Sequence, residues 1–347
     1  MSEDRAMIAD MTARIFADLA DPQTINAAQD TAWRAPLWSA LEEAGLTRAW
    51  LPEDAGGAAL DLETGFEILR ISGQYACPVA LAETMLGGWV LNQAGIDVPE
   101  GVIAIAPMRK RDRPAFSDDG LIQASPRSVA HGADAGHVVF VAGNTCHLLA
   151  QDGARSVPRP TDMGGDRADL SWESAEPIAS ASLPNADVLL LEMGAVARAC
   201  QITGALETAL HIVTEYSGER EAFGRKIGKF QAVQQNLAQL AGEVAAAMTA
   251  SGSAAATLSE GADPDARLLE VASAKIRVGE AAEAGGAIAH QAMGAIGWTQ
   301  EHILQRFTRR MWGWRDDFGN EAEWAVKLGT WMAAEGGNAI WPLLTTR

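Results

Sequence analysis

The spacing of apolar residues changes twice along the chain, and no other feature of the sequence constrains the fold as strongly. Residues 1–97 carry apolar side chains three or four positions apart, which is the period of an amphipathic helix. In residues 98–187 short β-prone runs, such as 137–141, alternate with clusters of Gly, Pro and Asp. Helical spacing returns in residues 188–347. We therefore predict a mainly α protein with an N-terminal all-α domain, a small middle β-domain and a C-terminal helical bundle domain.

The C-terminal part begins with a long helical segment. Its apolar positions share one face at three- and four-residue spacing: Val196, Cys200, Thr203, Leu206, Leu210 and Val213. Further helices are expected over about 231–259, 265–293, 299–316 and 321–340. Long helices joined by short connections are typical of an antiparallel bundle.

The charge of the chain disfavours some classes of partner. It carries 45 acidic and 27 basic residues, a net charge of -18, which argues against nucleic acid and anionic lipid. No apolar stretch approaches the ~20 residues of a membrane helix, and the amino terminus lacks a signal-peptide pattern, so we expect a cytoplasmic protein. The three cysteines and six histidines lack the spacing of a metal site, and no metal is predicted.

Residues 220–234 join the first long helix of the C-terminal part to the second, and they combine groups that suit a dinucleotide. Arg220 offers a planar guanidinium fork for a pyrophosphate, Phe223 offers a ring for stacking, and Gln231 both donates and accepts hydrogen bonds. A solvated basic turn between helices is the simpler interpretation of such a loop. The order RxxFG followed by FQxxQ favours a cofactor loop instead.

A second turn, at 290–301, contains Gln291, Gly294 and Ala295. Small residues are needed wherever the backbone must approach a ligand closely. The alternative interpretation is a glycine turn that ends a helix.

In order and spacing, these two segments resemble the acyl-CoA dehydrogenase family, and the Pro-Glu-x-x-Gly-Gly loop at 52–57 resembles the family's first loop. The resemblance implies an N-terminal helical domain, a middle β-barrel or sandwich and a C-terminal four-helix bundle. It also implies FAD as cofactor, α,β-dehydrogenation of an acyl-CoA thioester, and electron-transfer flavoprotein as electron acceptor. The FAD contacts would be Arg220, Phe223, Gln231, Gln291, Gly294 and Ala295. In the family the second turn approaches the FAD of a neighbouring subunit, and Ala295 stands where the family has glycine.

The same resemblance leaves the chain without the carboxylate base that such a dehydrogenation needs. Counting along the family pattern brings one usual position of the base to Phe318 and the other to Gly194. The nearby acids Asp317 and Glu192 are weak candidates, because adjacent side chains on a helix point about 100° apart. The flavin-facing segments of the middle domain are also reduced, with Ala130 in place of a threonine.

Three hypotheses remain open at this point. The first is the base-lacking subunit of a heteromer, as known among bacterial acyl-CoA dehydrogenases of steroid side-chain degradation, with a paralogous partner supplying the base. The second is a self-sufficient homo-oligomeric dehydrogenase that uses Asp317 or Glu192. The third is an FAD-free binding or scaffold protein of the same fold, because fold alone does not fix function.

Overall fold

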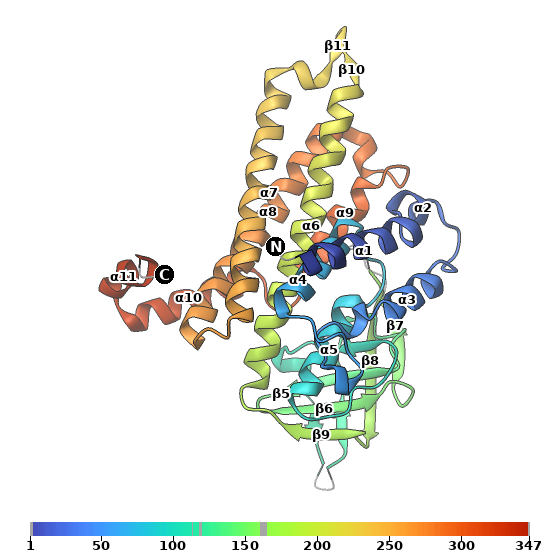
Figure 1. The fold of residues 1–347 in the computed structure, drawn as a ribbon, viewed down its shortest axis with the longest axis vertical. Coiled ribbons are helices and arrows are strands. Elements are labelled where there is room, and N and C mark those ends of the chain that lie inside the picture. The colour runs from blue at the N-terminus through green and yellow to red at the C-terminus, as the bar shows by residue number, and fades with distance from the viewer. Residues whose placement is uncertain (1–2, 113, 118–119, 160–164, 346–347) are drawn as a thin grey trace.

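The computed structural model describes residues 3–112, 114–117, 120–159 and 165–345 (Figure 1). The N-terminal part is helical. Asp21 and Asp61 begin two of its helices by accepting hydrogen bonds from the backbone N–H groups of Thr24 and Thr64. Its elements are α1 Glu3–Leu19, α2 Pro22–Ala27, α3 Arg34–Glu43, η1 Leu46–Arg48, η2 Glu53–Ala55, α4 Leu62–Gln74 and α5 Leu81–Gln93.

Two sheets form the middle part and share one core. The first has the order β1-β5-β6-β9, with β1 parallel to β5, and the second has the order β2-β3-β8-β4, with β7 also paired to β8. Phe140 from the first sheet and Trp172 from the second meet edge to face in this core. The strands are β1 Ile103–Ile105, β2 Ala115–Phe116, β3 Ile122–Ala124, β4 Val129–Ala130, β5 His137–Ala142, β6 Thr145–Ala150, β7 Arg155–Pro158, β8 Arg167–Ala175 and β9 Ala179–Ser182, with η3 Lys110–Asp112 between β1 and β2.

Long helices dominate the C-terminal part, where α6, α7 and α8 run side by side and α9 packs on α6 and α8 (Figure 1). A small hairpin, β10–β11, joins α6 to α7 at the end of the bundle away from the sheets (Figure 1). The elements are α6 Ala186–Glu219, β10 Glu221–Ala222, β11 Arg225–Lys226, η4 Ile227–Lys229, α7 Gln231–Ser259, α8 Pro264–Met293, η5 Gly294–Trp298, α9 Leu304–Arg315, α10 Glu321–Glu335, η6 Gly337–Ala339 and α11 Ile340–Thr345.

The helix α6 is long and apolar enough to cross a membrane by length and composition alone. Its most apolar window is 83% buried inside the protein. It is therefore a core helix, and its apolar surface packs against α4, α7, α8 and α9.

Two of the predicted C-terminal helices differ from the structure at their ends. The helix expected over 299–316 begins only at Leu304, because residues 294–298 form the 3-10 turn η5. The helix expected over 321–340 ends at Glu335, where Gly336 and Gly337 interrupt it before α11. α10 packs on α8, where the Trp331 indole donates to Asp265 at 3.0 Å, and α11 lies apart from the bundle (Figure 1).

Candidate functional site

Gly194 and Phe318, the two positions to which the family pattern assigns a base, lie against each other. Gly194 is buried near the start of α6, and Phe318 follows α9 with a left-handed backbone (φ 55°). A Cβ added to Gly194 would lie 2.3 Å from Cδ1 of the Phe318 ring. Only a glycine fits beneath that ring, so an aromatic side chain fills the space between the two positions.

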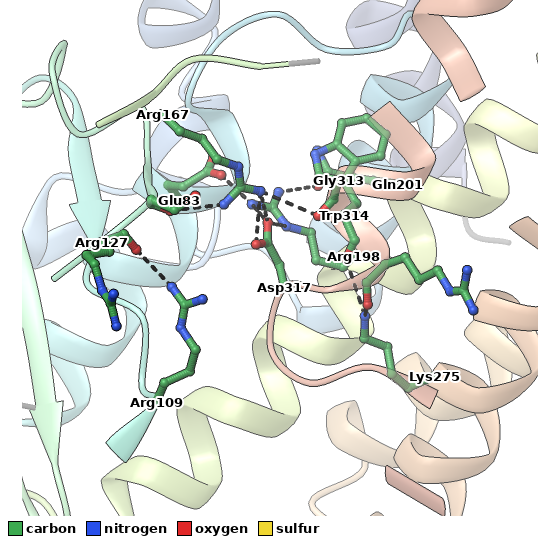
Figure 2. Close-up of polar contacts among 12 residues, drawn as sticks. Glu83, Arg109, Arg127, Arg167, Arg198, Gln201, Lys275, Gly313, Trp314 and Asp317 are labelled. Carbon is green, nitrogen blue, oxygen red and sulfur yellow. Dashed lines mark hydrogen bonds and ion pairs between the residues drawn. The ribbon is translucent and has the colours of Figure 1, made fainter. Parts of the chain in front are cut away.

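A buried ion network lies beside this contact (Figure 2). Arg198 on α6 is 2% exposed and pairs with Glu83 of α5 and with Asp317, whose Oδ2 is 3.0 Å from its Nη2. Arg167 of β8 donates to both oxygens of Asp317, at 3.0 and 2.9 Å. Two guanidiniums therefore face two carboxylates, and the buried charges are compensated. The network joins all three parts of the chain.

The two acidic candidates for a base are both held in ion pairs. Burial would raise the pKa of Asp317, but Arg167 and Arg198 outweigh it and hold that pKa below its ordinary value. Burial raises the pKa of Glu192, while its ion pair with Arg267, 2.9 Å from Nε to Oε2, opposes the rise. Both carboxylates are therefore engaged by guanidinium groups.

The cavity next to the network is too small for a flavin ring. It has a volume of about 10 Å³, room for roughly one water molecule. Glu83, Ala130, Arg167, Arg198 and Arg310 contribute to its lining. The ion network and its neighbours fill the surroundings of this cavity, so the cavity itself leaves no room for an isoalloxazine ring.

Lys275 on α8 supports the loop that carries Asp317 and Phe318. Its Nζ donates to the backbone carbonyls of Trp314 and Arg315, at 3.3 and 2.7 Å, at the end of α9 (Figure 2). Burial lowers the pKa of Lys275 to about 8, although Asp317 and Glu321 oppose the change. The lysine therefore caps the C-terminal end of α9.

The predicted cofactor loop, 220–234, contains the hairpin β10–β11, the turn η4 and the start of α7. Arg220 caps α6 through its backbone N–H, which donates to the carbonyl of Tyr216 at 2.8 Å, and Gln231 begins α7. Phe223 sits at the tip with φ 54° and is 96% exposed. Its ring meets Phe230 edge to face, and the Arg225 guanidinium lies 4.0 Å from the Phe230 centroid. The tip thus presents an aromatic face and cations to solvent.

The second predicted turn lies at the end of α8. Gln291 and Ala295 are exposed, and Gly294 ends the helix with φ 68°. Trp298, 61% exposed, stacks on His290 at a centroid distance of 3.7 Å. This turn packs on α8 and α9, whereas the hairpin packs on α6, and η4 after it packs on α6 and α7. Among the described residues no hydrogen bond or ring contact joins the two loops.

His131, Asp134 and Asp166 bring three metal-ligating atoms within 4.8 Å of one another, a grouping that sequence spacing did not reveal. Arg34 forms ion pairs with both carboxylates. A guanidinium thus already compensates this cluster, and we read it as a salt bridge between α3 and the middle part.

Sequence reasoning missed Arg198 and Glu83, although a signal for them exists. Each is a single charge inside an otherwise apolar helical run, 195–200 and 81–91. Charged side chains in such runs are rarely fully buried without a partner. Two lone buried charges of opposite sign therefore indicate a pair, but only the fold shows that they meet.

Comparisons with known proteins agree with this architecture. The profile described as "Acyl-CoA dehydrogenase, N-terminal domain" matches residues 2–97, and "Acyl-CoA dehydrogenase, C-terminal domain" matches residues 187–315. Among curated relatives, acyl-CoA dehydrogenase IpdE2 of Mycolicibacterium smegmatis is 28% identical over 317 residues, which is 90% of this chain and 94% of the relative.

Solved structures show the same fold. The ChsE4-ChsE5 complex of Mycobacterium tuberculosis superposes with a TM-score of 0.85 at 20% identity, over 95% of this chain and 97% of the other. The Tcur3481-Tcur3483 steroid acyl-CoA dehydrogenase gives a TM-score of 0.84 at 23% identity, over 97% and 99%. With the two matching profiles covering well over half of its length, the chain belongs to the acyl-CoA dehydrogenase family of oxidoreductases.

Proposed function

We propose that this chain is the base-lacking subunit of a heteromeric acyl-CoA dehydrogenase, and that it completes the FAD site of a paralogous partner subunit. The assembly would catalyse the α,β-dehydrogenation of an acyl-CoA thioester. One observation carries the proposal: the Phe318 ring lies directly on Gly194. An apolar ring occupies the space where a carboxylate would have to meet the substrate.

The distance between the two ends of α6 supports the sharing of a cofactor. The helix has 34 residues and is roughly 50 Å long at about 1.5 Å per residue. Gly194 lies near one end, and Arg220 and Phe223 follow the other. One dinucleotide cannot reach from the hairpin to the middle part of the same chain. The exposed ring of Phe223 is therefore free to contact a cofactor that another chain holds.

The self-sufficient alternative is less well supported, because Asp317 and Glu192 are both engaged by arginines. Protonating Asp317 would remove a partner of the buried Arg198 and of Arg167, and protonating Glu192 would remove the partner of the partly exposed Arg267. The scaffold alternative gives no reason for Arg220, Phe223 and Gln231 to sit together at an exposed tip.

The relatives suggest the wider setting. One similar structure is a complex of two differently named chains, ChsE4 and ChsE5, and another is a steroid acyl-CoA dehydrogenase named by two components. By analogy we place this chain in lipid and steroid side-chain degradation in the cytoplasm. An electron-transfer flavoprotein would then reoxidise the FAD of the assembly.

The test compares the chain purified alone with the chain co-expressed with a paralogous acyl-CoA dehydrogenase from the same genome. We expect a colourless lone chain and a yellow pair with about one FAD per two chains, because a shared site requires both partners. A lone chain that binds stoichiometric FAD and is bleached by an acyl-CoA would refute the proposal. The activities of the Asp317→Asn and Glu192→Gln variants would then show which carboxylate acts as the base. A pair that never binds FAD would point to the scaffold function.

A substitution at the hairpin tip tests the shared site within the pair. Phe223→Ala should lower FAD retention of the heteromer without changing the thermal stability of the lone chain, because the ring is almost fully exposed. Ile178→Ala, an exposed apolar residue of the middle part, is the matched control. If the Phe223→Ala and Ile178→Ala heteromers retain equal amounts of FAD, Phe223 does not contact the cofactor.

A further inference from the structure

Two polar side chains that line the cavity beside the ion network have no partner within the described part of the chain. This cavity of about 10 Å³ is lined from β4, β8, α6 and α9. The Arg310 guanidinium on α9 forms no hydrogen bond or ion pair there. The ring of His131, a residue that is 6% exposed, likewise forms no hydrogen bond to a described residue. Polar groups buried in this way call for an ion or a water molecule as partner.

The guanidiniums around the cavity differ in how their charge is compensated. Arg167 and Arg198 both pair with Asp317, toward which they converge in Figure 2. Arg310, the third guanidinium of the lining, pairs with no carboxylate among the described residues. Burial lowers the pKa of Arg310 to about 10, and Arg306, one turn earlier on α9, lowers it further. A partly buried cation without a partner is costly, so the cavity favours a negative charge.

Two carboxylates also line the cavity, and each of them faces an arginine of its own. Glu83 pairs with Arg198, and Asp166 pairs with Arg34 at 2.5 Å. The lining therefore carries three guanidiniums against two carboxylates. Because both carboxylates are neutralised by a close partner, the charge of Arg310 dominates the space in front of it.

The backbone around the cavity holds Arg310 and His131 in place. Gly165 has φ 97°, and a Cβ at this residue would overlap Nη1 of Arg310, so only a glycine fits beneath the guanidinium. His131 follows β4 with φ 52°, and its backbone N–H donates to the carbonyl of Asp166 at 2.8 Å. Burial lowers the pKa of His131, so its ring is neutral near pH 7 and donates one N–H. Donors fixed before a ligand arrives lower the entropic cost of binding.

We propose that the Arg310 cavity, the space lined by Arg310 and His131, binds a single monovalent anion of the size of chloride. Its volume of about 10 Å³ admits a group of roughly the size of one water molecule, which excludes phosphate and larger anions. The anion accepts hydrogen bonds from the guanidinium and from the neutral imidazole. It compensates the charge of Arg310 and thereby stabilises the packing of α9 against the middle part. The site needs neither the hairpin nor a partner subunit, so it is independent of the proposed function.

Thermal unfolding of the full-length chain tests the proposal, with sodium chloride replacing sodium gluconate at constant ionic strength. Gluconate is too large for the cavity. Chloride that binds the folded state should raise the melting temperature by about 1–4 °C, and the rise should follow the logarithm of its concentration above the dissociation constant. Bromide, which is close to chloride in size, should act in the same way. Equal melting temperatures in chloride and gluconate would overturn the proposal and leave a water molecule as the occupant.

Two arginine variants separate an ordered site from general electrostatic attraction. Arg310→Met should lose the response to chloride, and in gluconate it should be at least as stable as the wild type, because a charge without a partner is removed. Arg306→Met removes the same charge one turn earlier, from an arginine that does not line the cavity, and should keep most of the response. Equal losses in the two variants would overturn the proposal.

Two further measurements locate the anion and decide the question if Arg310→Met does not fold. His131→Asn suits the left-handed backbone but removes the ring, so it should weaken chloride binding about tenfold. Crystals of the full-length chain grown with bromide should show one anomalous-scattering peak within hydrogen-bond distance of the Arg310 guanidinium. An unchanged chloride affinity in His131→Asn, or a bromide peak elsewhere at a concentration that saturates the thermal response, would place the site outside the Arg310 cavity.

Discussion

At the scale of single residues, Phe318 is held in an unfavourable backbone conformation by its surroundings. A non-glycine residue with positive φ costs about 1–2 kcal/mol. The carbonyl of Phe318 accepts a hydrogen bond from the Trp324 indole at 3.0 Å, and its ring lies 6.0 Å from the Arg198 guanidinium and on Gly194. These contacts together hold the aromatic ring at a position to which the family pattern assigns a base.

A double-mutant cycle tests this packing. Gly194→Ala should lower the free energy of unfolding by about 1–3 kcal/mol, because its Cβ would overlap the Phe318 ring. Phe318→Ala removes the overlap, so the double variant should be more stable than additive effects predict, by about 0.5–3 kcal/mol in urea unfolding. Gly242→Ala on α7, where a Cβ meets no atom within 4 Å, should stabilise by up to about 1 kcal/mol. Strict additivity would show that the ring and Gly194 are not coupled.

At the scale of elements, α8 holds the end of α9 through Lys275. The two carbonyls that it binds belong to the last turn of α9, where backbone acceptors lack helical partners. The sequence predicted α8 closely, because Pro264 begins it and Gly294 ends it. It did not predict β8, although buried Ala168, Leu170 and Trp172 alternate along that strand. Charged and polar residues stand between these apolar positions, so the strand contains no continuous apolar run that would mark it in the sequence.

The buried lysine gives a dependence of stability on pH. Its folded pKa of about 8 lies below the about 10.4 of an unfolded lysine. Between these values the unfolded chain holds the extra proton, so the free energy of unfolding should rise with pH by up to about 1.4 kcal/mol per unit. Lys275→Met should lose this rise, and Lys226→Met, at the exposed hairpin, should keep it. Chemical denaturation from pH 7.5 to 10 measures both slopes, and parallel curves for the wild type and Lys275→Met would contradict the prediction.

At the scale of the whole molecule, the ion network ties together segments that are distant in sequence. Glu83, Arg167, Arg198 and Asp317 come from α5, β8, α6 and the loop after α9. Periodicity predicted the helices and the change to strands, because those depend on neighbouring residues. It could not predict which lone charges meet, since the partners of Arg198 depend on how the three parts pack. The loop at 220–234 between two helices was predictable because its residues are consecutive, whereas its two short strands were not.

Arg198→Met tests the network as a whole. The variant should lose about 3–5 kcal/mol of unfolding free energy near pH 7, because Glu83 and Asp317 lose a buried partner. Arg159→Met, which breaks an exposed pair, should lose no more than about 1 kcal/mol. Comparable losses in the two variants would show that the network contributes little.

The effect of Arg198→Met on the unfolding free energy should also change with pH, in a direction that the pKa of Glu83 determines. In the wild type Arg198 holds the pKa of Glu83 below its ordinary value against the effect of burial. That contribution is present above about pH 4 and is lost as the pH falls through the folded pKa. Without Arg198, burial alone raises the pKa of Glu83, so protonation relieves a buried charge. The difference in unfolding free energy between the wild type and Arg198→Met should therefore become smaller from pH 7 to pH 5. A difference that stays constant over this range would contradict the prediction.

The length of α6 has a consequence for how such a chain can change over time. Gly194 lies near the first residues of α6 and the hairpin follows its last residue, so most of the helix separates them. Substitutions around Phe318 can therefore accumulate without moving the exposed tip of the hairpin. After a gene duplication, one copy can lose chemistry at one end of the helix while selection on assembly still preserves the other end.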